Sequence, residues 1–232
     1  MRYDTAYVIV AGVAWIRRSR VETAGGRVDD TTWAVTFDGE PVVRRGPGSD
    51  IRAGELDGLS WELEWDEVAP SFETPHRLLS CVAPSHMVTA PAILVRGRVG
   101  GRTLDGSPGH SARLWGRRHA KSWAWAHASS ADGRWVHLLS AAAPPLPRVS
   151  QHASERHGPG LPLARAAVSG ASVRVGPYTA SADPASFVGL RYLDTDGSTI
   201  WCYHSEEARV GDLVGAMEIA TRSPIDGWRE EP

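Results

Sequence analysis

The chain has 232 residues, with 25 Lys plus Arg against 27 Asp plus Glu and a formal net charge of -2. This length fits one large β domain or two small ones. The balanced charge argues against nucleic acid as a partner, because surfaces that bind phosphate groups normally carry a basic excess.

The dominant sequence period is two residues, which is typical of β-strands with one buried face. The apolar stretch at 6–15 is too short for a membrane-spanning helix, which needs about 20 residues, and it lacks the layout of a secretory signal, so we interpret it as a strand. In 59–65 (LSWELEW) large apolar and polar residues alternate strictly. Further strands are predicted at 31–37, 78–82, 92–99, 121–127, 135–140, 172–175, 186–193 and 199–204.

Asp-Gly and Gly-Gly pairs separate these strands and favour tight turns, since glycine readily adopts positive φ. The pairs lie at 38–39, 57–58, 100–101, 105–106, 132–133 and 196–197. Helix is a minor component, although 162–168 and 205–214 could each form a short one. We therefore predict an antiparallel all-β fold: a meander, sandwich or barrel.

Two segments are not typical of strands. Residues 141–163 contain five prolines together with His152 and His157, which predicts a long surface loop that acts as a lid or as a plain connector. The Gly, Ser and Pro content of 101–109 favours a domain boundary. We place two strand-rich domains at 1–105 and 106–232.

The cysteines and tryptophans indicate the cellular compartment and the kind of interior that the protein forms. Cys81 and Cys202 are far apart in apolar segments, which fits buried thiols and a reducing, cytoplasmic location. Ten Trp stand against only 3 Phe and 5 Tyr. Because an indole combines a large apolar face with one N–H donor, these residues suit the walls of a cavity as well as a packed core.

The run at 109–127 (GHSARLWGRRHAKSWAWAH) resembles the central motif of the family of carotenoid hydratases (hydroxyneurosporene synthase), AttH-like, survival-factor-like and tocopherol-cyclase-like proteins. In that motif a Gly-rich turn leads into His-x-Trp-Gly-x-Arg and then a Trp-x-Trp strand. Residues 192–198 (YLDTDGS) and 201–205 (WCYHS) resemble the hairpin near the family's C-terminus. The two matches cover about a quarter of the chain.

The resemblance implies two consecutive lipocalin-like antiparallel barrels or half-barrels, with an apolar ligand site near their junction and no metal or nucleotide cofactor. Members of the family act on or bind isoprenoids and related lipophilic molecules. They are commonly longer than this chain, so the N-terminal barrel is expected to be reduced or to lack a preceding portion. Arg113 stands where the hydratases have the histidine of His-x-Trp, and a guanidinium cannot shuttle protons at pH 7. Carotenoid hydration is therefore poorly supported.

Trp123, Trp125 and His127 alternate with small residues and share one face of a strand. That face either lines a cavity, with the imidazole as polar anchor, or packs in the core around a hydrogen-bonded histidine. Four cations flank Trp115 and Trp123 and could hold an anionic ligand group or simply be solvated; they are Arg113, Arg117, Arg118 and Lys121.

Other candidate chemistry is weaker. His110, His119 and His127 are spaced too widely for familiar zinc motifs, so no metal site is predicted. Asp194 and Asp196 precede a turn glycine, where carboxylates usually bond their own backbone. No nucleophile elbow, phosphate loop or dinucleotide fingerprint is present with its required context, so no cofactor is predicted.

Three hypotheses follow. In the first, the chain binds a lipophilic small molecule. In the second, the same cavity catalyses cyclisation, isomerisation or hydration. In the third, the tryptophans are packed and the domain serves protein interaction alone. The predicted ligand-binding residues are Trp115, Arg117, Trp123, Trp125 and Trp201, with His127 also an anchor, and the predicted catalytic residues are His127, His110 and Tyr203.

Overall fold

The fold consists of antiparallel β-strands with one turn of 3-10 helix, η2 (Pro184–Ser186). The structure, a computed structural model, describes residues 1–37, 39–74, 85–130, 132–142, 148–159 and 164–228. The predicted all-β class is confirmed. Within these ranges no helix is long and apolar enough to cross a membrane.

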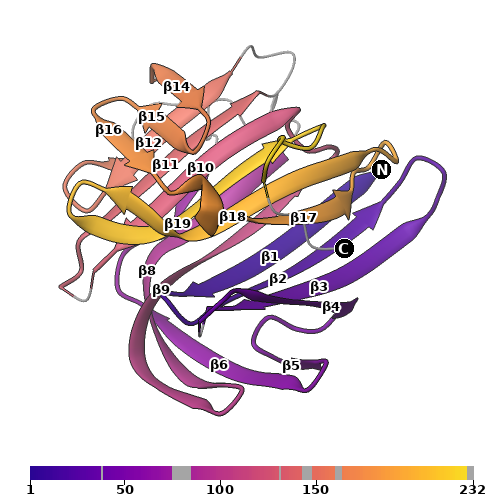
Figure 1. Cartoon of the computed structure of the whole chain (residues 1–232), viewed down its shortest axis with the longest axis horizontal. Coiled ribbons are helices and arrows are strands. Elements are labelled where there is room, and N and C mark those ends of the chain that lie inside the picture. The colour runs from indigo at the N-terminus through magenta and orange to yellow at the C-terminus, as the bar shows by residue number, and fades with distance from the viewer. Residues whose placement is uncertain (38, 75–84, 131, 143–147, 160–163, 229–232) are drawn as a thin grey trace.

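The first sheet contains nine strands in the order β4-β3-β2-β1-β9-β8-β6-β5, with β7 paired to β8 (Figure 1). Their bounds are β1 (Arg2–Val10), β2 (Ala14–Glu22), β3 (Val28–Thr36), β4 (Val42–Pro47), β5 (Ala53–Leu56), β6 (Leu59–Glu67), β7 (Phe72–Thr74), β8 (Ser85–Val99) and β9 (Arg102–Gly116).

The second sheet contains ten strands in the order β13-β12-β11-β10-β19-β18-β16-β15-β14, with β17 paired to β18. Their bounds are β10 (Ser122–Ser129), β11 (Trp135–Ala142), β12 (Val149–Ser154), β13 (Gly158–Pro159), β14 (Ala166–Ser169), β15 (Ser172–Val175), β16 (Tyr178–Ser181), β17 (Val188–Leu193), β18 (Thr199–Val210) and β19 (Leu213–Thr221).

In each sheet the first strand pairs with the last one. β1 is antiparallel to β9, and β10 is antiparallel to β19. This pairing curls each sheet back on itself, so the chain forms two nearly closed, barrel-like units that pack against each other (Figure 1). The predicted pair of consecutive barrels or half-barrels is confirmed.

Alternation along the strands divides most of the buried apolar residues among three large cores, beside a small fourth cluster that contains Phe72 and Trp135. On β1, Val8 and Val10 pack inside the first unit, whereas Tyr7 and Ile9 face the second unit. On β10, the alanines at 124, 126 and 128 pack inside the second unit, whereas Trp125 joins the shared core. The period of two therefore builds both barrel interiors and the junction between them.

Several predicted elements differ from the structure in informative ways. The apolar stretch 6–15 is not one strand but the ends of β1 and β2, joined by a turn at Gly12, whose φ is 64°. Residues 205–214 form no helix, because they continue β18 and enter β19. The predicted strand at 78–82, with Cys81, lies outside the described residues.

The proline-rich segment 141–163 contains more structure than predicted. Residues 149–154 form β12, which pairs with β11 and is mostly buried. The prolines flank this strand rather than interrupt it, so its N–H groups remain available for the ladder. The prolines at 144, 145, 147 and 162 lie outside the described part of the chain.

Strand β9 runs across the boundary predicted between 105 and 106. Gly106, with φ of 71°, marks a register shift in the β8–β9 ladder rather than the end of a domain. The chain passes from the first sheet to the second between Gly116 and Ser122. That the two units fold as separate domains stays a prediction.

Candidate functional site

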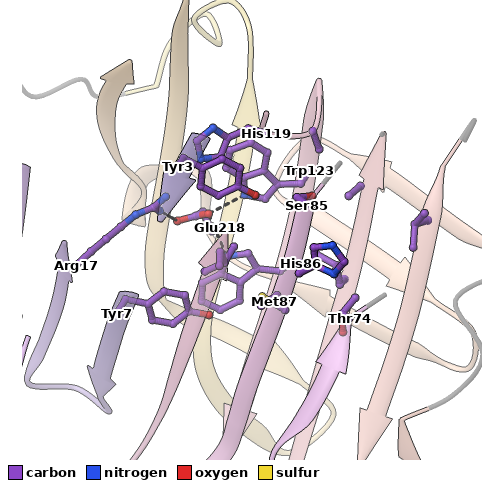
Figure 2. Close-up of a pocket in the computed structure, with 16 residues that line it drawn as sticks. Tyr3, Tyr7, Arg17, Thr74, Ser85, His86, Met87, His119, Trp123 and Glu218 are labelled. Atoms are coloured by element: carbon purple, nitrogen blue, oxygen red, sulfur yellow. Dashed lines mark hydrogen bonds and ion pairs between the residues drawn. The ribbon is translucent and has the colours of Figure 1, made fainter. Parts of the chain in front are cut away.

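A mainly apolar cavity of about 90 Å³ lies at the junction of the two units (Figure 2). Its wall combines residues of β1, β2, β7, β8 and β9 from the first sheet with residues of β10, β11, β12 and β19 from the second. A buried water needs about 10–15 Å³ of such space. The cavity therefore has room for a compact molecule or for one end of a longer one, and the barrel interiors are filled by their own cores.

A buried carboxylate, that of Glu218 on β19, organises one wall of this cavity. Its Oε1 accepts hydrogen bonds from the indole Nε1 atoms of Trp123, at 2.7 Å, and Trp125, at 3.0 Å. Its Oε2 lies 3.1 Å from Nη1 of Arg17, across the junction (Figure 2). Arg17 also donates to the Tyr192 hydroxyl at 2.9 Å. The two tryptophans are thus held by their polar edges, which leaves their apolar faces to line the cavity.

A second polar group, His119, lies on the connection between the sheets. Its Nδ1 is 2.8 Å from Oδ1 of Asp194, and its ring stacks on Tyr3 with a centroid distance of 3.7 Å. Asp194 also accepts hydrogen bonds from Arg222, at 2.6 Å, and from the backbone N–H of Thr195. These bonds outweigh burial and hold the pKa of the Asp194 carboxyl well below its usual range.

Because burial lowers the pKa of His119 more than Asp194 raises it, the ring is neutral at pH 7. An ionised carboxylate only accepts hydrogen bonds, so the single ring proton resides on Nδ1. Nε2 therefore presents a lone pair, and it has no partner among the described residues. The arrangement is that of an imidazole oriented by a carboxylate at the wall of a cavity.

Two hydroxyl groups in the wall also lack partners. Tyr7 and Thr74 line the cavity, are 3% and 4% exposed, and make no side-chain hydrogen bond within the described part of the chain. Burial raises the pKa of Tyr7, so its phenol stays protonated. Buried hydroxyls are usually hydrogen-bonded, so these groups are candidates for bonds to a molecule in the cavity.

Next to the cavity, a cluster of three buried histidines joins β9, β10 and β11. The ring centroids of His110 and His127 are 3.9 Å apart, and those of His127 and His137 are 5.7 Å apart. Burial lowers the pKa of all three, to about 4 for His137, so they are neutral at pH 7. In the ranges that the structure describes, no three His, Cys, Asp or Glu side chains are placed to hold a metal ion.

The predicted site residues fall into three groups. Trp123 and Trp125 line the cavity, as expected for wall residues. His110 and His127 belong to the neighbouring histidine cluster and are not among the residues that line the cavity. Their predicted catalytic role and the ligand-binding role of the tryptophans stay predictions.

The remaining predicted residues are not among those that line the cavity. Trp115 is 37% exposed and stacks on His86, and Arg117 is exposed. Trp201 is half-buried with Arg191 over its ring, while Tyr203 is buried inside the second unit and accepts a hydrogen bond from the Ile225 backbone N–H. Their residue types and their places in the motifs suggested a site. The positions of the three aromatic residues along their strands, however, direct those side chains to other faces of the sheets.

Sequence reasoning missed the groups that order the wall. Glu218 is the one charged residue of an otherwise mostly apolar strand, which indicates a buried partner but does not identify it, and Arg17 lies among other charged residues of β2. Asp194 was interpreted as a turn residue; it does accept the Thr195 N–H, but it also binds His119, 75 positions away. Asp196 fits the turn interpretation, since it accepts the Ser198 N–H.

Comparison of the sequence with known proteins finds distant relatives. No family model matches the chain. The uncharacterized proteins MT0513 and Rv0493c, from two strains of Mycobacterium tuberculosis, are each 26% identical to it in an alignment 189 positions long, and the match covers 70% of this chain and 57% of each relative. The chain thus spans a little over half the length of these curated relatives.

The crystal structure of an AttH-type protein from Nitrosomonas europaea is similar over 96% of this chain and 92% of that one. The TM-score is 0.55 and the sequence identity 12%. This likeness agrees with the resemblance seen in the sequence motifs at the level of the fold. A shared fold does not by itself establish a shared function.

Proposed function

We propose that this chain binds a lipophilic small molecule in the junction cavity. The observation that carries the proposal is a mainly apolar cavity in which Arg17 and Glu218 are paired with each other, while a few neutral polar groups have no hydrogen-bond partner among the described residues. Small-molecule sites commonly combine such an apolar lining with a few polar groups that set the orientation. Polyketides and isoprenoids, in whole or in part, fit this chemistry.

Binding can be tested with a neutral apolar fluorophore, N-phenyl-1-naphthylamine, whose emission rises in an apolar site. Ala141 lines the cavity, whereas its neighbour Ala142 does not. We expect Ala141→Leu, which fills space in the cavity, to weaken binding at least tenfold, while Ala142→Leu leaves it unchanged. No binding by the folded wild-type protein would refute the proposal and favour a packed interaction domain.

A second candidate function is catalysis of a cofactor-independent isomerisation, cyclisation or hydration in the same cavity. The observation that favours it is the hydrogen bond that Nδ1 of His119 donates to Asp194, because an imidazole oriented in this way can act as a general base or acid. In a screen of lipophilic substrates, His119→Gln should lower any turnover by about 10²-fold or more, the usual scale for such a group. An unchanged rate would exclude His119 from the chemistry.

We further propose a cytoplasmic location and no nucleic-acid partner. The buried thiol of Cys202 is free, which agrees with a reducing compartment. The near-neutral charge supports a small-molecule partner over a polyanion. Fractionation and a gel-shift assay would test these two proposals directly.

A further inference from the structure

The charged groups of the cavity wall, and the carboxylate that bonds the wall residue His119 from behind, are already paired. The carboxylate of Glu218 receives two indole N–H groups and the guanidinium of Arg17. The carboxylate of Asp194 is paired with Arg222 and bonded to His119. A ligand carboxylate or ammonium would enter a buried site whose charges already balance, and desolvation of that group would oppose binding.

Several uncharged polar groups of the wall lack a partner among the described residues, and the one on His119 can act only as a hydrogen-bond acceptor. Its Nδ1 proton is committed to Asp194, so its Nε2 can only accept a hydrogen bond. The ring is 6% exposed and lines the cavity, so a bonding partner for Nε2 has to come from the cavity side. A carbonyl or an ether cannot serve, because neither donates a proton.

We infer that the ligand is an uncharged alcohol or phenol whose hydroxyl donates a hydrogen bond to Nε2 of His119. This inference rests on the proposed binding function and adds the chemical class of the ligand. The stacked rings of Tyr3 and Trp123 flank His119, with ring-centroid distances of 3.7 and 6.0 Å, and would hold the apolar body next to that hydroxyl (Figure 2). A flat or unsaturated body would pack well against the aromatic side chains that line this part of the cavity.

Three compounds that share a 4-ethylphenyl group and differ in the polar substituent test the class of polar group: 4-ethylphenol, 4-ethylanisole and 4-ethylbenzoate. Calorimetric titration at pH 7.5 compares a neutral donor, a neutral acceptor and an anion. We expect the phenol to bind at least tenfold more tightly than either of the others. Equal affinities for the phenol and the anisole would overturn the inference, as would tighter binding of the benzoate.

His119→Phe keeps an aromatic ring for stacking and removes the acceptor, so the preference for the phenol should fall to about one. The matched control is His157→Phe, at an exposed histidine that is not among the cavity-lining residues, which should retain the preference. If His119→Phe does not fold, Asp194→Asn serves instead. Its amide can donate to Nδ1, which moves the ring proton to Nε2, so the preference should shift toward the anisole.

The outcomes separate this inference from the proposed function. Binding of N-phenyl-1-naphthylamine without a preference for the phenol would refute the hydroxyl class alone. Failure of that fluorophore and of all three compounds to bind would refute both. A phenol preference that survives in His119→Phe would place the hydroxyl elsewhere in the cavity and overturn the assignment to His119.

Discussion

Nη1 of Arg17 lies 3.1 Å from Oε2 of Glu218, and this ion pair joins the two sheets across 201 positions of sequence. Both side chains are 3% exposed, so removal of one leaves the other charged and buried. We expect Glu218→Ala to lower the free energy of unfolding by about 3–5 kcal/mol, measured by urea denaturation.

The matched control is the exposed pair of Arg96 and Asp66, whose side chains are 58% and 63% exposed. Because water screens this pair, Asp66→Ala should change the free energy of unfolding by less than about 1 kcal/mol. Similar small losses in both variants would contradict a buried ion pair at the junction.

The indole N–H groups form the second testable feature. Trp125→Phe keeps an aromatic ring but removes the hydrogen bond to Glu218, and bonds to charged groups contribute about 1.5–3 kcal/mol. We expect a loss of that size. Since Trp123 donates to the same oxygen, the double variant should lose a different amount from the sum of the single losses. Trp201→Phe is the control, because no hydrogen bond of its indole is found in the described ranges.

The histidine cluster predicts a dependence of stability on pH. Burial lowers the pKa of His110, His127 and His137 in the folded state, whereas the unfolded value is about 6.5. The unfolded state therefore binds more protons below that pH. Stability is fully present above about pH 6.5 and falls with acidification, by up to about 1.4 kcal/mol per pH unit for each histidine.

His127→Gln should flatten this slope between pH 6.5 and 5, since one of the buried rings with a lowered pKa no longer titrates. His157→Gln, at an exposed ring, should leave it unchanged. Urea denaturation at a series of pH values measures both. A slope that is the same in wild type and His127→Gln would mean that His127 is not held neutral by burial.

Gly215 permits the close approach of β19 to β10. A Cβ there would overlap the His127 carbonyl oxygen and lie 2.6 Å from Cα of Ala128. Gly215→Ala should therefore displace the strand that holds Glu218 and lower the free energy of unfolding by about 1–3 kcal/mol or more. Gly101→Ala, at a position with open space around it, should be close to neutral. Equal melting temperatures for the two variants would contradict this account.

The sequence by itself determined the fold class and much of the strand layout. Alternation in 59–65 and at Trp123 and Trp125 follows from the period of the extended chain, which is a local property. The glycines at 58, 133 and 197 adopt positive φ at turns for an equally local reason, the absence of a Cβ. Their neighbours in sequence sufficed to predict them.

Only the tertiary structure decided which residues meet. His119 and Asp194 are 75 positions apart, and Arg17 and Glu218 are 201 apart, so no local pattern pairs them. They meet because the first and last strands pair in each sheet, which brings β2 and β19 to the junction. The same long-range pairing decided that Trp125 borders a cavity whereas Trp201, an equally large aromatic residue on another strand, does not.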